Sequence, residues 1–84
     1  MYRVLLVDDD PTICMGLTKL INWKECGFEV AGTAGNGEEA ISLHKKHNFD
    51  LIITDIKMPV MDGLELILKL YDMNRPVQVI ILSA

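Results

Sequence analysis

The sequence predicts an α/β fold in which a parallel sheet is covered by helices on both faces. Apolar segments alternate with segments of helical periodicity, which is typical of strands joined by helical crossovers. Two expected strands, Val4-Leu5-Leu6-Val7 and Leu51-Ile52-Ile53-Thr54, are almost continuously apolar, as strands buried on both faces are. The 84 residues are enough for one small domain.

The first strand is expected at Tyr2–Val7, and the helix after it is expected to begin at Asp10-Pro11. An aspartate suits the N-cap, and a proline suits the first helical position. Gly16 interrupts this helix, and we attribute it to close packing against a neighbouring element. The apolar side of the helix is expected to consist of Ile13, Leu17, Leu20 and Ile21.

The second strand is expected at Phe28–Ala34, and the second helix begins at Asn36-Gly37. Acidic residues fill the first turn of that helix and basic residues its last turn, which matches the helix dipole. Its inward residues are expected to be Ala40, Leu43 and Ile41. The third strand follows at residues 50–54.

The third helix is expected at residues 64–73, with Asp62 as its N-cap. Its inward residues are expected to be Leu64, Ile67, Leu68 and Tyr71. The fourth strand, at residues 77–82, has the composition of an inner strand. An apolar strand at an exposed sheet edge promotes aggregation, so we expect a further strand to belong to this fold.

Composition and charge narrow the classes of function. The net charge of −4 and the pI of about 4.9 argue against direct binding of nucleic acid. No signal peptide and no apolar run of membrane-spanning length is visible. Cys14 and Cys26 match no metal or redox spacing and are expected to be reduced thiols in the cytoplasm. His44 and His47 lack a third ligand and are expected to be surface residues.

Acidic residues follow two of the expected strands. Asp8, Asp9 and Asp10 follow the first strand, and Asp55 follows the third. The carboxyl ends of parallel strands meet at one edge of a sheet, so Asp8, Asp9 and Asp55 are expected to share a pocket. Grouped carboxylates repel one another, and a hard cation such as Mg²⁺ removes that penalty. A carboxylate in such a site can act as a nucleophile and form an aspartyl-phosphate.

The motif Asp55-x-x-Met58-Pro59-x-Met61-Asp62-Gly63, together with the acidic pair after the first strand, resembles the receiver domain of bacterial two-component response regulators. The resemblance covers the whole chain. It implies a flavodoxin-like, three-layer α/β/α fold with strand order 2-1-3-4. Residues 1–84 would form the amino-terminal portion of a receiver, because a complete receiver continues through a further helix, a fifth strand and a last helix.

The resemblance also implies roles for individual residues. Asp55 would accept a phosphoryl group from a sensor histidine kinase and would be the only residue with a catalytic role. Mg²⁺ would be held by Asp8, Asp9, Asp55 and the backbone carbonyl of Lys57. Ser83 would be the switch hydroxyl that contacts the phosphate. Met58, Pro59 and Gly63 would shape the loop after Asp55.

For the intact protein, the resemblance implies a cytoplasmic regulator of transcription with a DNA-binding output domain. It also implies that the protein can form a homodimer. Residues 1–13 and 35–40 are similar to those of regulators with an AraC-type output domain.

Two other functions stay open at this stage. Asp8-x-Asp10 also fits the first motif of haloacid-dehalogenase-type phosphohydrolases, with Asp8 as nucleophile, Asp10 as acid/base and Ser83 in the second motif. That alternative leaves the motif from Asp55 to Gly63 unexplained. A module that binds partners without being phosphorylated is the third interpretation. Phosphorylation of Asp55 would indicate the receiver, and phosphorylation of Asp8 would indicate the phosphohydrolase.

Overall fold

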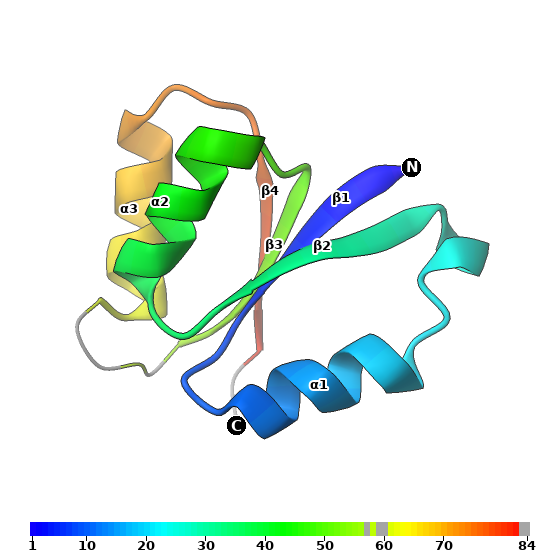
Figure 1. Cartoon of the computed structure of the whole chain (residues 1–84). Coiled ribbons are helices and arrows are strands. Elements are labelled where there is room, and N and C mark those ends of the chain that lie inside the picture. The colour runs from blue at the N-terminus through cyan, green and yellow to red at the C-terminus, as the bar shows by residue number, and fades with distance from the viewer. Residues whose placement is uncertain (57, 59–60, 83–84) are drawn as a thin grey trace.

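A four-stranded parallel sheet forms the centre of the computed structural model, which describes residues 1–56, 58 and 61–82. The strands are β1 (Tyr2–Val7), β2 (Phe28–Ala34), β3 (Leu51–Asp55) and β4 (Gln78–Leu82), in the order β2-β1-β3-β4. The helices are α1 (Pro11–Leu20), the short 3₁₀ helix η1 (Lys24–Cys26), α2 (Gly37–His47) and α3 (Gly63–Asp72). Helix α1 lies on one face of the sheet, and α2 and α3 lie on the other (Figure 1). The predicted flavodoxin-like, three-layer fold is confirmed.

The core has two parts, one on each face of the sheet. Alternate residues of β1 point to opposite faces. Leu5 and Val7 therefore join the core beneath α2 and α3, and Val4 and Leu6 join the core beneath α1. All four side chains are buried, which confirms that β1 is an inner strand. In the described part of the chain β4 is an edge strand, with Ile80 and Leu82 exposed.

Each of the three α-helices has a side chain that caps its amino end. The predicted caps at Asp10 and Asp62 are confirmed, and Asn36 caps α2. Each side-chain oxygen accepts a backbone N–H of the first turn at 2.9 Å, which satisfies one of the donors that a helix start leaves unbonded.

The predicted inward side of α3 is largely wrong, since Ile67 alone of its four residues is half-buried. Leu66 and Leu70 are the buried leucines, while Leu64, Leu68 and Tyr71 are 56%, 67% and 85% exposed. Apolar residues occupy both sides of this helix, so periodicity alone allowed two orientations. Leu66 and Leu70 are four residues apart and pack on the sheet together.

The predicted apolar side of α1 is also largely wrong. Ile13, Leu20 and Ile21 are exposed, whereas Cys14 is buried and Leu17 packs against the same core. Gly16 is not explained by close packing, because a Cβ atom there would meet no other group within 4 Å.

His44 is buried, which contradicts its prediction as a surface residue, whereas His47 is exposed. The Nδ1 atom of His44 accepts the backbone N–H of Phe49 at 3.0 Å, just after α2 ends. The rings of these two residues stack with centroids 6.2 Å apart. His44 therefore belongs to the connection between α2 and β3, a role that helical periodicity does not reveal.

Candidate functional site

The pairing of β1 with β3 brings the predicted acids together. Val7 pairs with Thr54 in the parallel register, so Asp8 and Asp55 are the next residues on adjacent strands, whose backbones lie about 4.8 Å apart in a sheet. Carboxylate oxygens of Asp8, Asp9 and Asp55 all lie within 4.8 Å of one another. The structure therefore contains the predicted pocket of three carboxylates.

Backbone hydrogen bonds fix the orientation of two of these side chains. Oδ1 of Asp8 accepts the N–H of Asp10 at 2.9 Å, and Oδ1 of Asp55 accepts the N–H of Ile56 at 2.8 Å. The buried Thr54 donates its hydroxyl to the backbone carbonyl of Asp55 at 2.8 Å. The carboxylates are thus held by the ends of the strands that carry them.

The charge of this site favours a cation. Burial raises the pKa of Asp8, and the negative charges of Asp55 and Asp9 raise it further, while the hydrogen bond from Asp10 acts in the opposite direction. A raised carboxyl pKa means that the site resists holding all its negative charges at once. Three oxygen ligands are the donor set that a hard cation such as Mg²⁺ prefers. The residues present therefore fit Mg²⁺.

The loop after Asp55 returns to the site at Gly63. The N–H of Gly63 donates to the carbonyl of Ile56 at 2.8 Å. A Cβ atom on Gly63 would lie only 2.8 Å from the backbone oxygen of Asp55, so a glycine is needed for this close approach. Met58 packs against the core, and its sulfur lies 3.9 Å from the hydroxyl of Thr54. Lys57, Pro59 and Ser83, which carry three other predicted roles, lie outside the described residues.

Asp10 does not belong to the group of clustered carboxylates. Its side chain accepts the N–H of Thr12 and caps α1. A phosphohydrolase would use Asp8 and Asp10 together. Here Asp8 lies in the carboxylate cluster, whereas Asp10 caps a helix.

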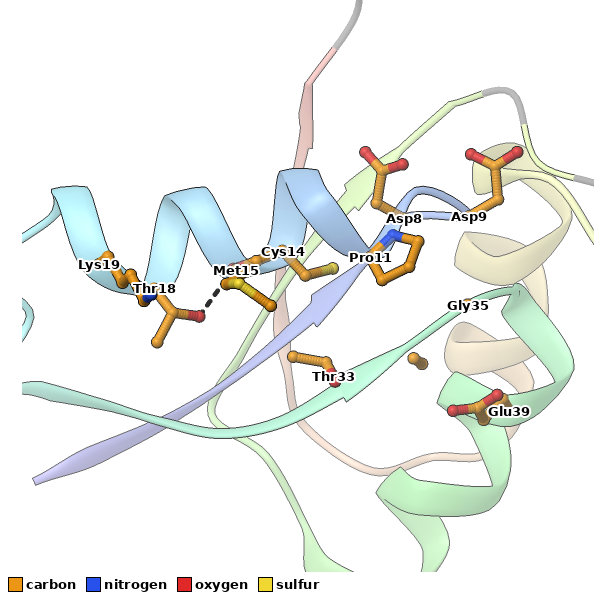
Figure 2. Close-up of a pocket in the computed structure, with 11 residues that line it drawn as sticks. Asp8, Asp9, Pro11, Cys14, Met15, Thr18, Lys19, Thr33, Gly35 and Glu39 are labelled. Carbon is orange, nitrogen blue, oxygen red and sulfur yellow. Dashed lines mark hydrogen bonds between the residues drawn. The ribbon is translucent and has the colours of Figure 1, made fainter.

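A groove of about 520 Å³ lies beside the carboxylates, between α1, the end of β2 and the start of α2. In Figure 2 the carboxylates of Asp8 and Asp9 point away from Thr33 and Glu39, which line its other side. Cys14 lines the groove from α1 as a free thiol, and burial raises its pKa. Sequence patterns gave no indication of this groove, because its lining residues are dispersed over three elements.

Comparison with known proteins identifies the family. A family model of the response regulator receiver domain matches residues 4–84. The chain belongs to the receiver domain family. The uncharacterized transcriptional regulatory protein YesN from Bacillus subtilis is 45% identical over 85 residues, which cover 99% of this chain and 23% of YesN.

Solved receiver structures have the same fold. The REC domain of AraT, a response regulator from Geobacillus stearothermophilus, is 34% identical with a TM-score of 0.89, covering 98% of this chain and 64% of that one. The response regulator TrrA from Thermotoga maritima, solved in complex with Mg²⁺-BeF, is 39% identical with a TM-score of 0.85, covering 100% of this chain and 70% of that one.

The chain spans between 23% and 33% of the length of the first curated relatives that it matches. Within the described parts of the chain, no helix combines the length and the apolar character that crossing a membrane requires.

Proposed function

We propose that this domain accepts a phosphoryl group on Asp55, with Mg²⁺ held by Asp8, Asp9 and Asp55, and that a sensor histidine kinase is the donor. The observation that carries this proposal is the cluster of three carboxylates at the ends of β1 and β3, within 4.8 Å of one another. Membership of the receiver family supports it. The Mg²⁺-BeF complex of TrrA supports the choice of metal.

Asp55 would supply the nucleophilic oxygen. Its Oδ1 accepts the N–H of Ile56, and among the described residues Oδ2 has no hydrogen bond. Oδ2 would attack the phosphorus of a phosphohistidine, forming a P–O bond as the P–N bond breaks. The electron pair of the P–N bond stays on the imidazole nitrogen, which then takes up a proton. Phosphoryl transfer of this kind depends mainly on positioning and charge neutralisation.

Bound Mg²⁺ would neutralise the negative charge that the phosphoryl group brings to three carboxylates. Asp8 and Asp9 would hold the ion from the end of β1, with Asp8 acting largely through water, and the backbone carbonyl of Lys57 would add a ligand. Ser83 would act as the switch hydroxyl for the phosphate, and Met58, Pro59 and Gly63 would shape the loop. Phosphorylation would then bias a two-state element that follows β4.

In the intact protein we propose a DNA-binding output domain that acts on transcription in the cytoplasm. The relative YesN is named a transcriptional regulatory protein and is longer than this chain. A two component transcriptional regulator AraC from Clostridium phytofermentans is 36% identical with a TM-score of 0.90, which supports an AraC-type output. Residues 1–84 would be the amino-terminal portion of the receiver, and dimerisation would involve parts of the protein beyond them.

The test is to treat the complete protein with acetyl phosphate and Mg²⁺ and to locate the added phosphate by mass spectrometry. Asp55→Asn should abolish the label, and Asp10→Asn should retain it because Asp10 only caps α1. Label that persists in Asp55→Asn would refute the assignment. Phosphate on Asp8 would favour the phosphohydrolase, which the family match does not favour. No uptake by the wild type would favour the unphosphorylated module.

A further inference from the structure

The start of α2 and the loop that follows Asp55 meet in an unusually close contact. Gly37 is the first residue of α2 and is buried. A Cβ atom at this position would lie 2.6 Å from Cγ and 2.7 Å from Cβ of Met61, distances that real Cβ atoms do not tolerate. The Met61 side chain therefore lies directly over the Cα atom of Gly37, where only a hydrogen leaves enough room.

A hydrogen bond and the core reinforce this contact. The N–H of Gly37 donates to the carbonyl of Met61 at 3.2 Å. Met61 is half-buried and packs against the core cluster beneath α2 and α3. The backbone of Gly37 is not left-handed, since no positive φ is found there. Space for Met61, and not backbone conformation, is thus the reason for a glycine at this position.

The same loop segment also touches the backbone of Asp55. Two residues after Met61, Gly63 donates its N–H to Ile56 at 2.8 Å, and a Cβ atom on Gly63 would lie 2.8 Å from the carbonyl oxygen of Asp55. Residues 61–63 therefore lie between α2 on one side and the backbone of Asp55 on the other. A shift of Met61 would be passed to Asp55 through Gly63.

We propose that Met61, seated on Gly37, is a positioning residue for phosphoryl transfer to Asp55, a role that rests on the function proposed above. Phosphoryl transfer is sensitive to placement, and a displacement of about 1 Å can slow an enzyme-catalysed step about 100-fold. Neither Met61 nor Gly37 belongs to the group of clustered carboxylates. They act by fixing the segment that abuts the Asp55 backbone.

The test is a double-mutant cycle in the complete protein, with the rate of phosphorylation by acetyl phosphate and the urea unfolding curve as readouts. Gly37→Ala should displace Met61 and slow phosphorylation about 10- to 100-fold. Met61→Ala leaves a gap without pushing the loop, so it should slow the reaction less. The double variant should recover only part of the loss caused by Gly37→Ala, because Met61→Ala removes the Cγ atom at 2.6 Å but keeps the Cβ atom at 2.7 Å; such non-additivity marks a direct contact.

Gly16→Ala is the matched control, since a Cβ atom there meets nothing within 4 Å. It should keep the wild-type rate and unfold at a higher urea concentration, because alanine favours a helix more than glycine does. A Gly37→Ala protein that is folded and phosphorylated at the wild-type rate would overturn the positioning role alone. Should Gly37→Ala fail to fold, an unchanged rate in Met61→Ala would overturn it. Absence of label in the wild type would overturn the proposed function and this inference together.

Discussion

The buried His44 makes the stability of this domain sensitive to acid. Its Nδ1 accepts the N–H of Phe49 at 3.0 Å, so Nδ1 is unprotonated and the neutral ring carries its proton on Nε2. That atom is buried without a hydrogen-bond partner among the described residues. Burial, and after it the positive charge of Arg75, lowers the pKa of His44. Arg75 lies close because its guanidinium donates to the carbonyls of His44 and Lys45 at the end of α2.

The sign of the effect follows from proton binding in the two states. A histidine in an unfolded chain has a pKa of about 6.5. As the pH falls through that value the unfolded state takes up a proton, whereas folded His44 resists protonation because its pKa is lowered. The stabilisation is therefore complete above that pH and is lost as the pH falls. Between pH 7.5 and 5.5 the loss from this residue reaches at most about 1.4 kcal/mol, the value for a folded state that binds no proton.

The assay is equilibrium urea unfolding of wild type and His44→Asn at a series of pH values. The Asn Oδ1 can accept the Phe49 N–H in place of Nδ1, and an amide does not titrate. We expect His44→Asn to be less stable at pH 7.5 but to lose less stability on acidification than the wild type. His47→Asn is the control, because that side chain is exposed, and it should follow the wild-type slope. Equal losses in wild type and His44→Asn would refute the reasoning.

Three further outcomes are expected. Mg²⁺ at ten times its dissociation constant should raise the free energy of unfolding by about 1.4 kcal/mol. Urea unfolding at a series of Mg²⁺ concentrations should show a smaller increase for Asp8→Asn than for the wild type. Without divalent cations, Asp8→Asn should be more stable than the wild type by a few tenths of a kcal/mol after solvent screening, because the neutral side chain relieves burial and repulsion; lower stability in urea would contradict this. Leu66→Ala should lower the free energy of unfolding by about 2–5 kcal/mol, and Leu68→Ala should lower it by less than about 0.5 kcal/mol. Similar melting curves for the two variants would contradict the observed orientation of α3.

The fold was predictable because the local sequence patterns of strands, helices and caps agree with the structure that forms. Strands β1 and β2 have the predicted bounds, and β3, β4 and the three α-helices begin within one residue of theirs, whereas the 3₁₀ helix η1 was not predicted. Orientation within the helices was less predictable, because α1 and α3 carry apolar residues on more than one side. For α3, the sheet selects Leu66 and Leu70 and leaves Leu68 in solvent. Only the tertiary contact makes that choice, so periodicity could not.

The carboxylate pocket was predictable for a different reason. Asp8 and Asp55 each follow an apolar strand directly, and parallel pairing then brings them to one edge of the sheet. The contact of Gly37 with Met61 and the burial of His44 depend on residues far apart in the sequence or on the path of a loop. No local pattern marks them, and their roles could be inferred only from the structure.

The register between β1 and β3 has a consequence for variation in the core. Leu5, Leu6 and Val7 pair in turn with Ile52, Ile53 and Thr54. All of these side chains are buried except the half-buried Ile53, and their pairing determines which residues lie together at the strand ends. A slip of one residue would move Asp55 by about 3.3 Å along the sheet and reverse the face of every side chain on β3. Substitutions among the aliphatic residues of this register should therefore weaken Mg²⁺ binding at the proposed site while leaving every carboxylate intact. A loss of phosphorylation in such a variant would report on strand alignment and not on chemistry.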